Sequence, residues 1–415
     1  MLRQSILLML VVLLLGIVFL REPRLQRSEE IFLHWLLNNS ELRSMPVPLT
    51  IVELGGKPVV QKENSRIDPT ERFLRGSGTT NSPLEFALFV QALLEFKPAM
   101  VAFEPILKWP ERIKDEEQIL VDQVMHVPKL LLAAELTATP DPDAPVAEIP
   151  GFPQVTGKRG ELVAFSGIGR QPDEDLRLIS TIGFINLPKE ITDDVHVPLI
   201  FQYRGEVVPS FALQAAMFWM GLTPAEMKID IGSSISLPGG KKIPLRSDGT
   251  VLINPNAARG ARHIGLNELL LAAQQHEKKI PMAPLDDLRD QIVLARTAGS
   301  PFDPPDVFAA TIATIQANSF VRRVSWIFDC VMLVLVVAIS GPIRRFSRID
   351  LLLGAIAFSA AYCLIALALL SHWNVWLPGL LPLGAVWVVV LFSVILQKPK
   401  NSTRTVTVAA PPPMP

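Results

Sequence analysis

The sequence predicts an α/β fold: a mixed sheet with a parallel βαβ first half and a small β-meander, plus four transmembrane α-helices. Three observations lead to this prediction. Strand-like and helix-like segments alternate over the first third of the chain. Short strand-like segments separated by glycine turns follow, and strongly apolar segments lie at both ends. At 415 residues the chain has room for two or three domains.

The first strand and helix have clear sequence signals. "PLTIVELGG" (Pro48–Gly56) is typical of a buried strand ending in glycines. In "SPLEFALFVQALLEFKP", Ser82 is the expected N-cap, with Pro83 at the first helical position and Glu85 completing a capping box. Apolar residues then recur at helical spacing, which predicts a helix with one buried face.

The alternation continues through two more strands. "AMVAFEP" is a second strand, Asp115–Val124 a second helix and "KLLLAAEL" a third strand. Strand, helix, strand, helix, strand predicts a parallel sheet with right-handed crossovers. The proline-rich and acidic segment Thr137–Gly160 is expected to be a long loop.

The second half mixes short strands with helices. "GFINLP" and "VPLIFQYRGEVVPSFALQAAMFWMG" predict two strands and a helix that stops at Gly221. "SISLPGGKKIPLRSDGTVLINP" predicts a meander with glycine turns. We expect a helix over Leu266–Glu277, a strand in "DQIVLARTAG" and a last helix over Asp306–Arg323 that continues into the membrane.

Four apolar segments predict membrane crossings. Ser5–Leu20 follows Arg3 and lacks a small-residue cleavage site, which favours an uncleaved signal anchor over a cleaved signal peptide. Three later runs are long enough to cross a hydrocarbon core about 30 Å thick. The predicted division is therefore 1–20 stub and anchor, 28–323 outer domain, 324–343, 351–370 and 375–396 transmembrane helices, and 397–415 disordered tail.

Charged connectors set the expected orientation. Arg344, Arg345 and Arg348 follow the second apolar segment, and the tail "QKPKNSTRTVTVAAPPPMP" is also basic, so both are expected in the cytoplasm. Residues 28–323 would then be extracytoplasmic, with both termini cytoplasmic. Asp329, near the start of one apolar run, is expected at the membrane interface.

Composition excludes several classes of function. Lys and Arg total 39 against 40 Asp and Glu, so no basic field favours nucleic-acid binding. The two cysteines, Cys330 and Cys363, lie in apolar segments, so no disulfide is expected in the middle of the chain. The six histidines show no metal-ligand spacing, and no nucleophile elbow or dinucleotide fingerprint occurs. The sequence predicts no cofactor, no metal site and no enzyme.

Three carboxylates end the three predicted parallel strands: Glu53, Glu104 and Glu135. In open α/β sheets, ligands bind beyond the carboxyl ends of the strands. Three acids meeting there would bind a cation or an amine, so these residues are the predicted ligand-binding site. The alternative is that each carboxylate caps a helix or accepts from loop amides.

Several stretches of the chain resemble the second class of CHASE domains, and the resemblance extends from about Ser28 to Leu396. They are "IVELGG", "KPAMVAFEPIL", "IPLRSDGTVLINP" and, as the most specific, "VPL…YRGEVVPSFALQAA". The resemblance implies a bacterial sensory domain that follows an N-terminal anchor and precedes three transmembrane helices. Glu53 and Glu104 stand where the family usually carries Asp. The family usually continues into a kinase, cyclase or similar output domain, whereas here a short tail follows the apolar segments.

The resemblance and the apolar segments together predict a multi-pass protein of the bacterial inner membrane that senses a small ligand or an envelope protein. A separate cytoplasmic signalling protein is the expected partner, and a homodimer is left open. The alternative is an envelope scaffold whose outer domain binds another protein. A hydrolase that uses the three strand-end carboxylates is the third hypothesis.

Overall fold

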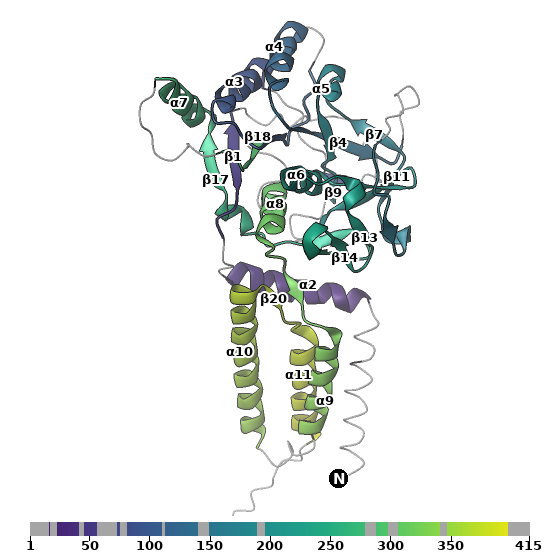
Figure 1. Cartoon of the computed structure of the whole chain (residues 1–415). Helices are drawn as coiled ribbons and strands as arrows, with labels where there is room; N and C mark the ends of the chain where they lie inside the picture. Colours follow the sequence, from purple (N-terminus) through teal and green to yellow (C-terminus); the bar gives the residue numbers. More distant parts are fainter. Residues whose placement is uncertain are drawn as a thin grey trace, which may run out of the picture. The chain divides into compact units, whose positions relative to one another are not determined.

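The computed structural model describes residues 16, 23–40, 45–55, 73–74, 81–109, 113–139, 149–188, 196–278, 288–297, 306–340 and 347–396 (Figure 1). The chain forms two compact units. One comprises Glu41–Arg322, and the other combines Met1–Ser40 with Arg323–Pro415. Each unit is described separately below.

A seven-stranded, largely parallel sheet forms the centre of the 41–322 unit. Its order is β17-β1-β18-β3-β4-β7, and β8 also pairs with β4. Among these strands only β7 runs antiparallel to its partner. The strands are β1 (Leu49–Leu54), β3 (Met100–Phe103), β4 (Leu130–Thr137), β7 (Gly167–Arg170), β8 (Thr181–Phe184), β17 (Arg262–Gly265) and β18 (Ile292–Thr297).

The late strand β18 lies between β1 and β3, although more than 150 residues separate it from either in sequence. Ile292, Val293, Leu294 and Ala295 are all fully buried. A continuous apolar run of this kind is typical of a strand covered on both faces. The sequence predicts the parallel sheet and this strand, but it does not predict the strand's central position.

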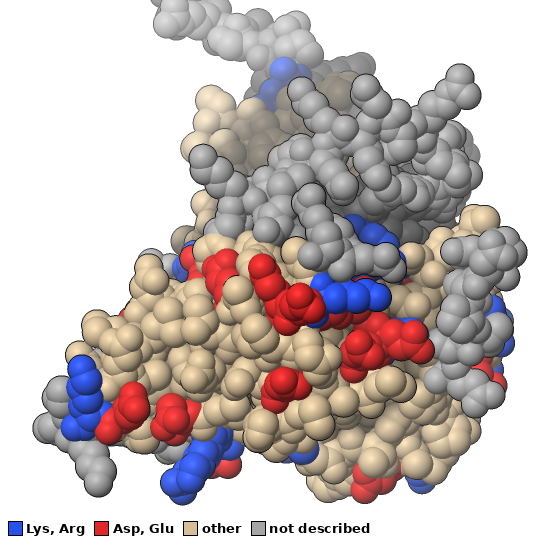
Figure 2. Space-filling view, turned by 90° about the horizontal axis from the view of Figure 1, so that it is seen from above, with Lys and Arg blue, Asp and Glu red and all other residues tan. Residues whose placement is uncertain are grey.

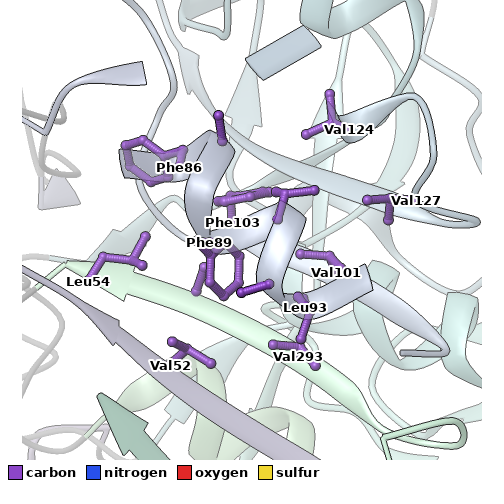
Figure 3. Close-up of a cluster of buried hydrophobic side chains, with 14 of the residues drawn as sticks. Val52, Leu54, Phe86, Phe89, Leu93, Val101, Phe103, Val124, Val127 and Val293 are labelled. Atoms are coloured by element: carbon purple, nitrogen blue, oxygen red, sulfur yellow. The ribbon is translucent and has the colours of Figure 1, made fainter. Parts of the chain in front are cut away.

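Three helices cover one face of the sheet: α3 (Pro83–Leu94), α4 (Lys114–Val124) and α7 (Leu266–Glu277). Phe86 and Phe89 of α3 both meet Phe103 edge to face, with ring centroids 5.7 Å apart (Figure 3). Phe103 comes from β3, so the aromatic contacts join helix to sheet. Truncating such a buried phenylalanine to alanine costs about 3–5 kcal/mol.

Two helices lie on the other side of the sheet: α6 (Phe211–Met220) and α8 (Val307–Ala317) (Figure 1). They pack on each other through Phe211 and Phe308, whose rings are 5.4 Å apart. Ser210 caps the start of α6, and Gly221 ends it in a left-handed conformation with φ +68°, as the sequence predicts.

Smaller strands complete the 41–322 unit. Within the predicted meander, β14 and β15 pair antiparallel, whereas β16 pairs with β10 in a separate sheet; β13, which precedes the predicted segment, pairs with β14. Part of the predicted loop 137–160 forms β5, which pairs with β13. The remaining elements of this unit are β2 (Phe73–Leu74), β5 (Val155–Thr156), β6 (Ala164–Phe165), α5 (Glu174–Leu178), β9 (Leu187–Pro188), β10 (His196–Pro198), β11 (Ile200–Tyr203), β12 (Glu206–Pro209), β13 (Lys228–Asp230), β14 (Ser234–Ser236), β15 (Lys242–Pro244) and β16 (Thr250–Leu252).

Two predicted helix ends differ in the structure, namely the capping box at the start of α3 and the position where α8 ends. At α3 the Ser82 hydroxyl accepts from the Leu84 N–H at 3.2 Å, while the Glu85 carboxyl accepts from the backbone of Gly55. The prediction that the last helix of the unit runs to Arg323 is wrong, because α8 ends at Ala317. Asn318 adopts a left-handed conformation with φ 51°, which terminates a helix.

The second unit contains α2 (Pro23–Asn39), α9 (Trp326–Ser340), α10 (Arg348–Trp373) and α11 (Leu380–Leu396). Within the described residues, one helix, α10, is long and apolar enough to cross a membrane. Its 26 residues span about 39 Å at 1.5 Å per residue. The apolar helices α9 and α11 are shorter, at 15 and 17 residues.

The three C-terminal helices fall within or close to the predicted segments. α11 begins at Leu380, later than the predicted start at residue 375. The preceding β20 (Val375–Trp376) is extended, and Pro378 disfavours a helical conformation in Leu377 before it. The predicted anchor Ser5–Leu20 lies outside the described residues except for Gly16, which is helical and buried. The tail 397–415 also lies outside them.

Candidate functional site

The three predicted glutamates lie on the same face and at the same edge of the central sheet. Glu53 is near the end of β1, Glu104 follows β3 directly and Glu135 is near the end of β4. Side chains alternate between the two faces of a strand. Because Leu54 and Phe103 point into the core of Figure 3, Glu53 and Glu104 belong to the opposite face.

An arginine that the sequence analysis did not single out lies between two of these glutamates. Arg296 of β18 pairs in register with Glu53 of β1. On its other side, Ala295 pairs with Phe103, and the Glu104 N–H donates to the Ala295 carbonyl at 3.0 Å. The β18 strand therefore brings one guanidinium into the row of carboxylates.

Arg296 connects the edge of the sheet with the start of α8. Its guanidinium donates to the Asp306 carboxylate at 2.6 Å and to the Glu53 carboxylate at 3.4 Å. Asp306 is the N-cap of α8, and its other oxygen accepts from the Ala309 N–H at 3.2 Å. The Arg296 and Asp306 side chains are 12% and 8% exposed, against 49% for Glu53. The Arg296–Asp306 pair is therefore the buried part of this arrangement.

Glu135 forms a separate ion pair. Arg170 of β7 donates to both of its carboxylate oxygens, at 2.8 and 2.6 Å. Such two-point contacts are the strongest and most directional ion pairs in proteins. Glu135 therefore holds the antiparallel strand β7 against β4, and a cation that binds at Glu135 has to compete with Arg170.

Among the described residues at this edge, the acidic side chains are Glu53, Glu104, Glu135 and Asp306, and the basic ones named above are Arg170 and Arg296. Glu104 is 3% exposed, whereas Glu53 is open to solvent. A carboxylate that is open to solvent, as Glu53 is, attracts a cation or an amine. The two arginines are the residues that sequence reasoning missed. The signal that was available is that Arg296 also ends an otherwise apolar strand.

A second cluster of acidic side chains lies between α4 and α5. Burial, together with the neighbouring Asp173 and Asp175 charges, raises the pKa of the Glu117 carboxyl to about 7, while Lys114 opposes the increase. Asp173 also accepts from the Trp109 N–H at 3.1 Å. Acidic side chains are prominent on the face of the molecule seen in Figure 2. The Glu117 carboxyl is consequently set to gain or lose a proton near neutral pH.

The second unit has a buried polar contact of its own. Arg323 donates to Asp329 at 2.9 Å, and its guanidinium lies 5.7 Å from the centre of the Trp376 ring. Asp329 is 1% exposed. That Asp329 lies at the membrane interface stays a prediction; the structure shows its side chain enclosed by protein and paired with an arginine.

Metal binding has little support in the described part of the chain. No group of three or more His, Cys, Asp or Glu side chains there is arranged to hold a metal ion. Among the histidines in the described residues, His196 contacts Arg246.

A largely parallel α/β unit and a helix long and apolar enough to cross a membrane occur in the same chain, which suggests membrane association. The chain belongs to the CHASE2 family, whose domain matches residues 8–324. The resemblance inferred from the sequence motifs is therefore confirmed, and the matched region ends before the three C-terminal helices. CHASE2 domains are typically extracytoplasmic sensory domains and are usually non-catalytic. Comparisons with curated proteins and with solved structures found no match.

Proposed function

We propose that this protein is a multi-pass receptor of the bacterial inner membrane. Its CHASE2 domain binds a ligand outside the cytoplasm and passes a signal through the apolar helices to a separate partner protein. The observation that carries the proposal is the Arg296–Asp306 pair. Arg296 of this pair contacts Glu53 at the edge of the sheet, and Asp306 caps α8, the helix that precedes α9 in the chain.

The proposed signal follows a short path along the chain. A cationic ligand at Glu53 competes with the Arg296 guanidinium for the Glu53 carboxylate, and any change in Arg296 alters the cap of α8 through Asp306. α8 spans 11 residues, and α9 begins nine residues after α8 ends. A ligand shifts a conformational equilibrium only if it has different affinities for the two conformations. The two conformations proposed here are one with Arg296 paired to Glu53 and one with Arg296 released from Glu53.

The proposed ligand is a cation or an amine, held by Glu53, Glu104 and Glu135. Glu53 supplies the exposed carboxylate and Glu104 the buried one. Glu135 acts through its ion pair with Arg170, which fixes the β7 side of the edge. The proposed topology has four crossings, namely the 5–20 segment, α9, α10 and α11, with residues 41–322 outside the cytoplasm.

Coupling is tested with the full chain in lipid nanodiscs by hydrogen–deuterium exchange. Arg296→Gln should change the exchange of residues 318–329, because it removes the partner of the α8 cap. Arg170→Gln is the matched control, since it breaks a comparable ion pair that does not contact α8. Unchanged exchange in Arg296→Gln, or an equal change in both variants, would reject the proposed path.

Ligand binding is tested separately by thermal unfolding of the same preparation with magnesium, calcium or spermidine added. We expect one of these probes to raise the melting temperature of the wild type and not of a Glu53→Gln, Glu104→Gln double variant. No shift with any probe, together with a membrane protein retained on pull-down, would favour the scaffold alternative.

A further inference from the structure

The helix α2 exposes large apolar side chains on one face. Ile31 is 71% and Trp35 42% exposed, and they lie four residues apart, one turn along the helix. Leu33, Leu36 and Leu37 of the same helix are buried. α2 is therefore covered by protein on one side and presents an isoleucine and a tryptophan on the other.

α2 is fixed to one particular end of the helices in its unit. The Glu29 carboxylate accepts from the backbone N–H groups of Gly379 and, at 3.1 Å, of Leu380, where α11 begins. The ring of Phe32 lies against Gly379 so closely that any side chain at Gly379 would collide with it. α2 also contacts α10. α2 thus lies across the end of the bundle where α10 finishes and α11 starts.

That end of the bundle has a second exposed tryptophan. Trp373, the last residue of α10, is 67% exposed. Earlier in α10, Leu364 and Ile365 are 67% and 56% exposed, as expected for side chains that face lipid tails. Tryptophan is enriched where the hydrocarbon core meets water, because its ring is apolar and its N–H is polar. Both exposed tryptophans, Trp35 and Trp373, therefore belong to helices that meet at this end of the bundle.

We propose that α2 lies in the membrane–water interface, with Ile31 and Trp35 among the lipid headgroups and upper acyl chains. Helices of this kind lie in the plane of the membrane, with the apolar face turned toward the lipid. Here the protein-facing side is held by the contacts of Glu29 and Phe32 with the start of α11. The occupant of the exposed face is a phospholipid surface, since α2 contacts α10, whose exposed side chains include Leu364 and Ile365. This inference rests on the proposed crossing by α10 and is independent of any ligand of the 41–322 unit.

The test measures the surroundings of Ile31 directly. A nitroxide is attached at Ile31→Cys in the full chain, with Cys330 and Cys363 replaced by serine, in nanodiscs of phosphatidylcholine and phosphatidylglycerol. Leu364→Cys on α10 is the lipid-facing reference, and Ser233→Cys in an exposed turn is the aqueous reference. All three positions are at the surface, so the labels should leave the fold intact.

Relaxation by oxygen, which partitions into lipid, is compared with relaxation by a water-soluble nickel chelate. We expect an oxygen-to-nickel ratio at Ile31 severalfold above that at Ser233 and below that at Leu364. A ratio equal to that at Ser233 would show that α2 faces water and would overturn the proposal. Low accessibility to both reagents, with dipolar coupling between labels on two copies, would instead identify a protein contact and would overturn it as well.

Discussion

Charged side chains at the end of the sheet are joined by partners from distant parts of the chain. Glu53 and Arg296 are 243 residues apart in sequence, and Glu135 and Arg170 are 35 apart. The glutamates were predictable because each ends an apolar strand. Their arginine partners were not, because pairing across a sheet depends on strand order, which local sequence does not determine.

Arg296 is expected to be the most sensitive residue of this edge. Arg296→Gln leaves the buried Asp306 carboxylate without its charge partner, so the free energy of unfolding should fall by about 3 kcal/mol. Glu53→Gln removes only a 3.4 Å contact at a half-exposed side chain and should cost less than about 1 kcal/mol. Denaturant unfolding of the full chain in detergent, followed by circular dichroism, measures both. Equal losses would show that the Arg296–Asp306 pair contributes no more than a surface contact.

Glu117 should make stability depend on pH. Its pKa is about 7 in the folded protein against an ordinary 4.5, so the folded state holds the proton more tightly than the unfolded chain. The free energy of unfolding should therefore be higher at pH 5 than at pH 8, by about 1 kcal/mol, since solvent screening reduces the contribution of these coupled carboxyls. Thermal melts of the full chain at the two pH values measure the difference.

Two variants isolate this effect. Glu117→Gln removes the titrating group, and Asp173→Asn removes the neighbouring charge that raises its pKa. Both should reduce the difference in stability between pH 5 and pH 8. If the wild type and Glu117→Gln respond to pH in the same way, another group is responsible.

The individual helices and strands follow from local sequence more closely than their arrangement does. The helices α3, α4 and α7 match their predicted ranges, because Ser82, the acidic first turn of α4 and regular apolar spacing mark them. α8 ended earlier than expected. The polar residues Gln316–Ser319 interrupt its apolar run, and Asn318, a residue type that tolerates the left-handed conformation, is a local stop signal that the prediction did not use.

Two glycines test how turns end these elements. Gly221 has φ +68° and open space around it, so Gly221→Ala should cost about 1 kcal/mol, the strain of a left-handed alanine. Gly249 has φ +81°, and a Cβ there would lie 2.7 Å from Leu162 and 3.0 Å from Ile200. Gly249→Ala should therefore cost about 1–3 kcal/mol more, because overpacking adds to the strain. Thermal unfolding of the two variants ranks them, and equal melting temperatures would contradict the predicted crowding at Gly249.

At the scale of the whole molecule, the position of the spans determines which side of the membrane each unit faces. The apolar segments are readable from the sequence because a helix needs about 20 apolar residues to span hydrocarbon. The helix α2 was not predicted, because its residues alternate apolar and polar without the length of a span. Its burial depends on α10 and α11, more than 300 residues away.

Reporter fusions test the proposed four-crossing topology. A periplasm-active reporter inserted after Gly157 should be active, whereas the same reporter after Pro415 should be silent, since the two positions are predicted to lie on opposite sides. A cytoplasm-active reporter should give the inverse pattern. The same response at both positions would reject an odd number of crossings between them.

The left-handed residue Asn318 limits what kind of motion can pass from α8 to α9. A continuous helix would have transmitted rotation and axial translation directly from α8 to α9. Instead, residues 319–325 are non-helical and include the extended Arg322–Arg323. These residues are not a free linker, because Arg322–Arg323 pair with β20 and the Val324 N–H donates to the Trp376 carbonyl at 3.0 Å. The segment after α8 is therefore fastened to the strand that precedes α11, so a displacement that travels along the chain toward α9 also acts on α11.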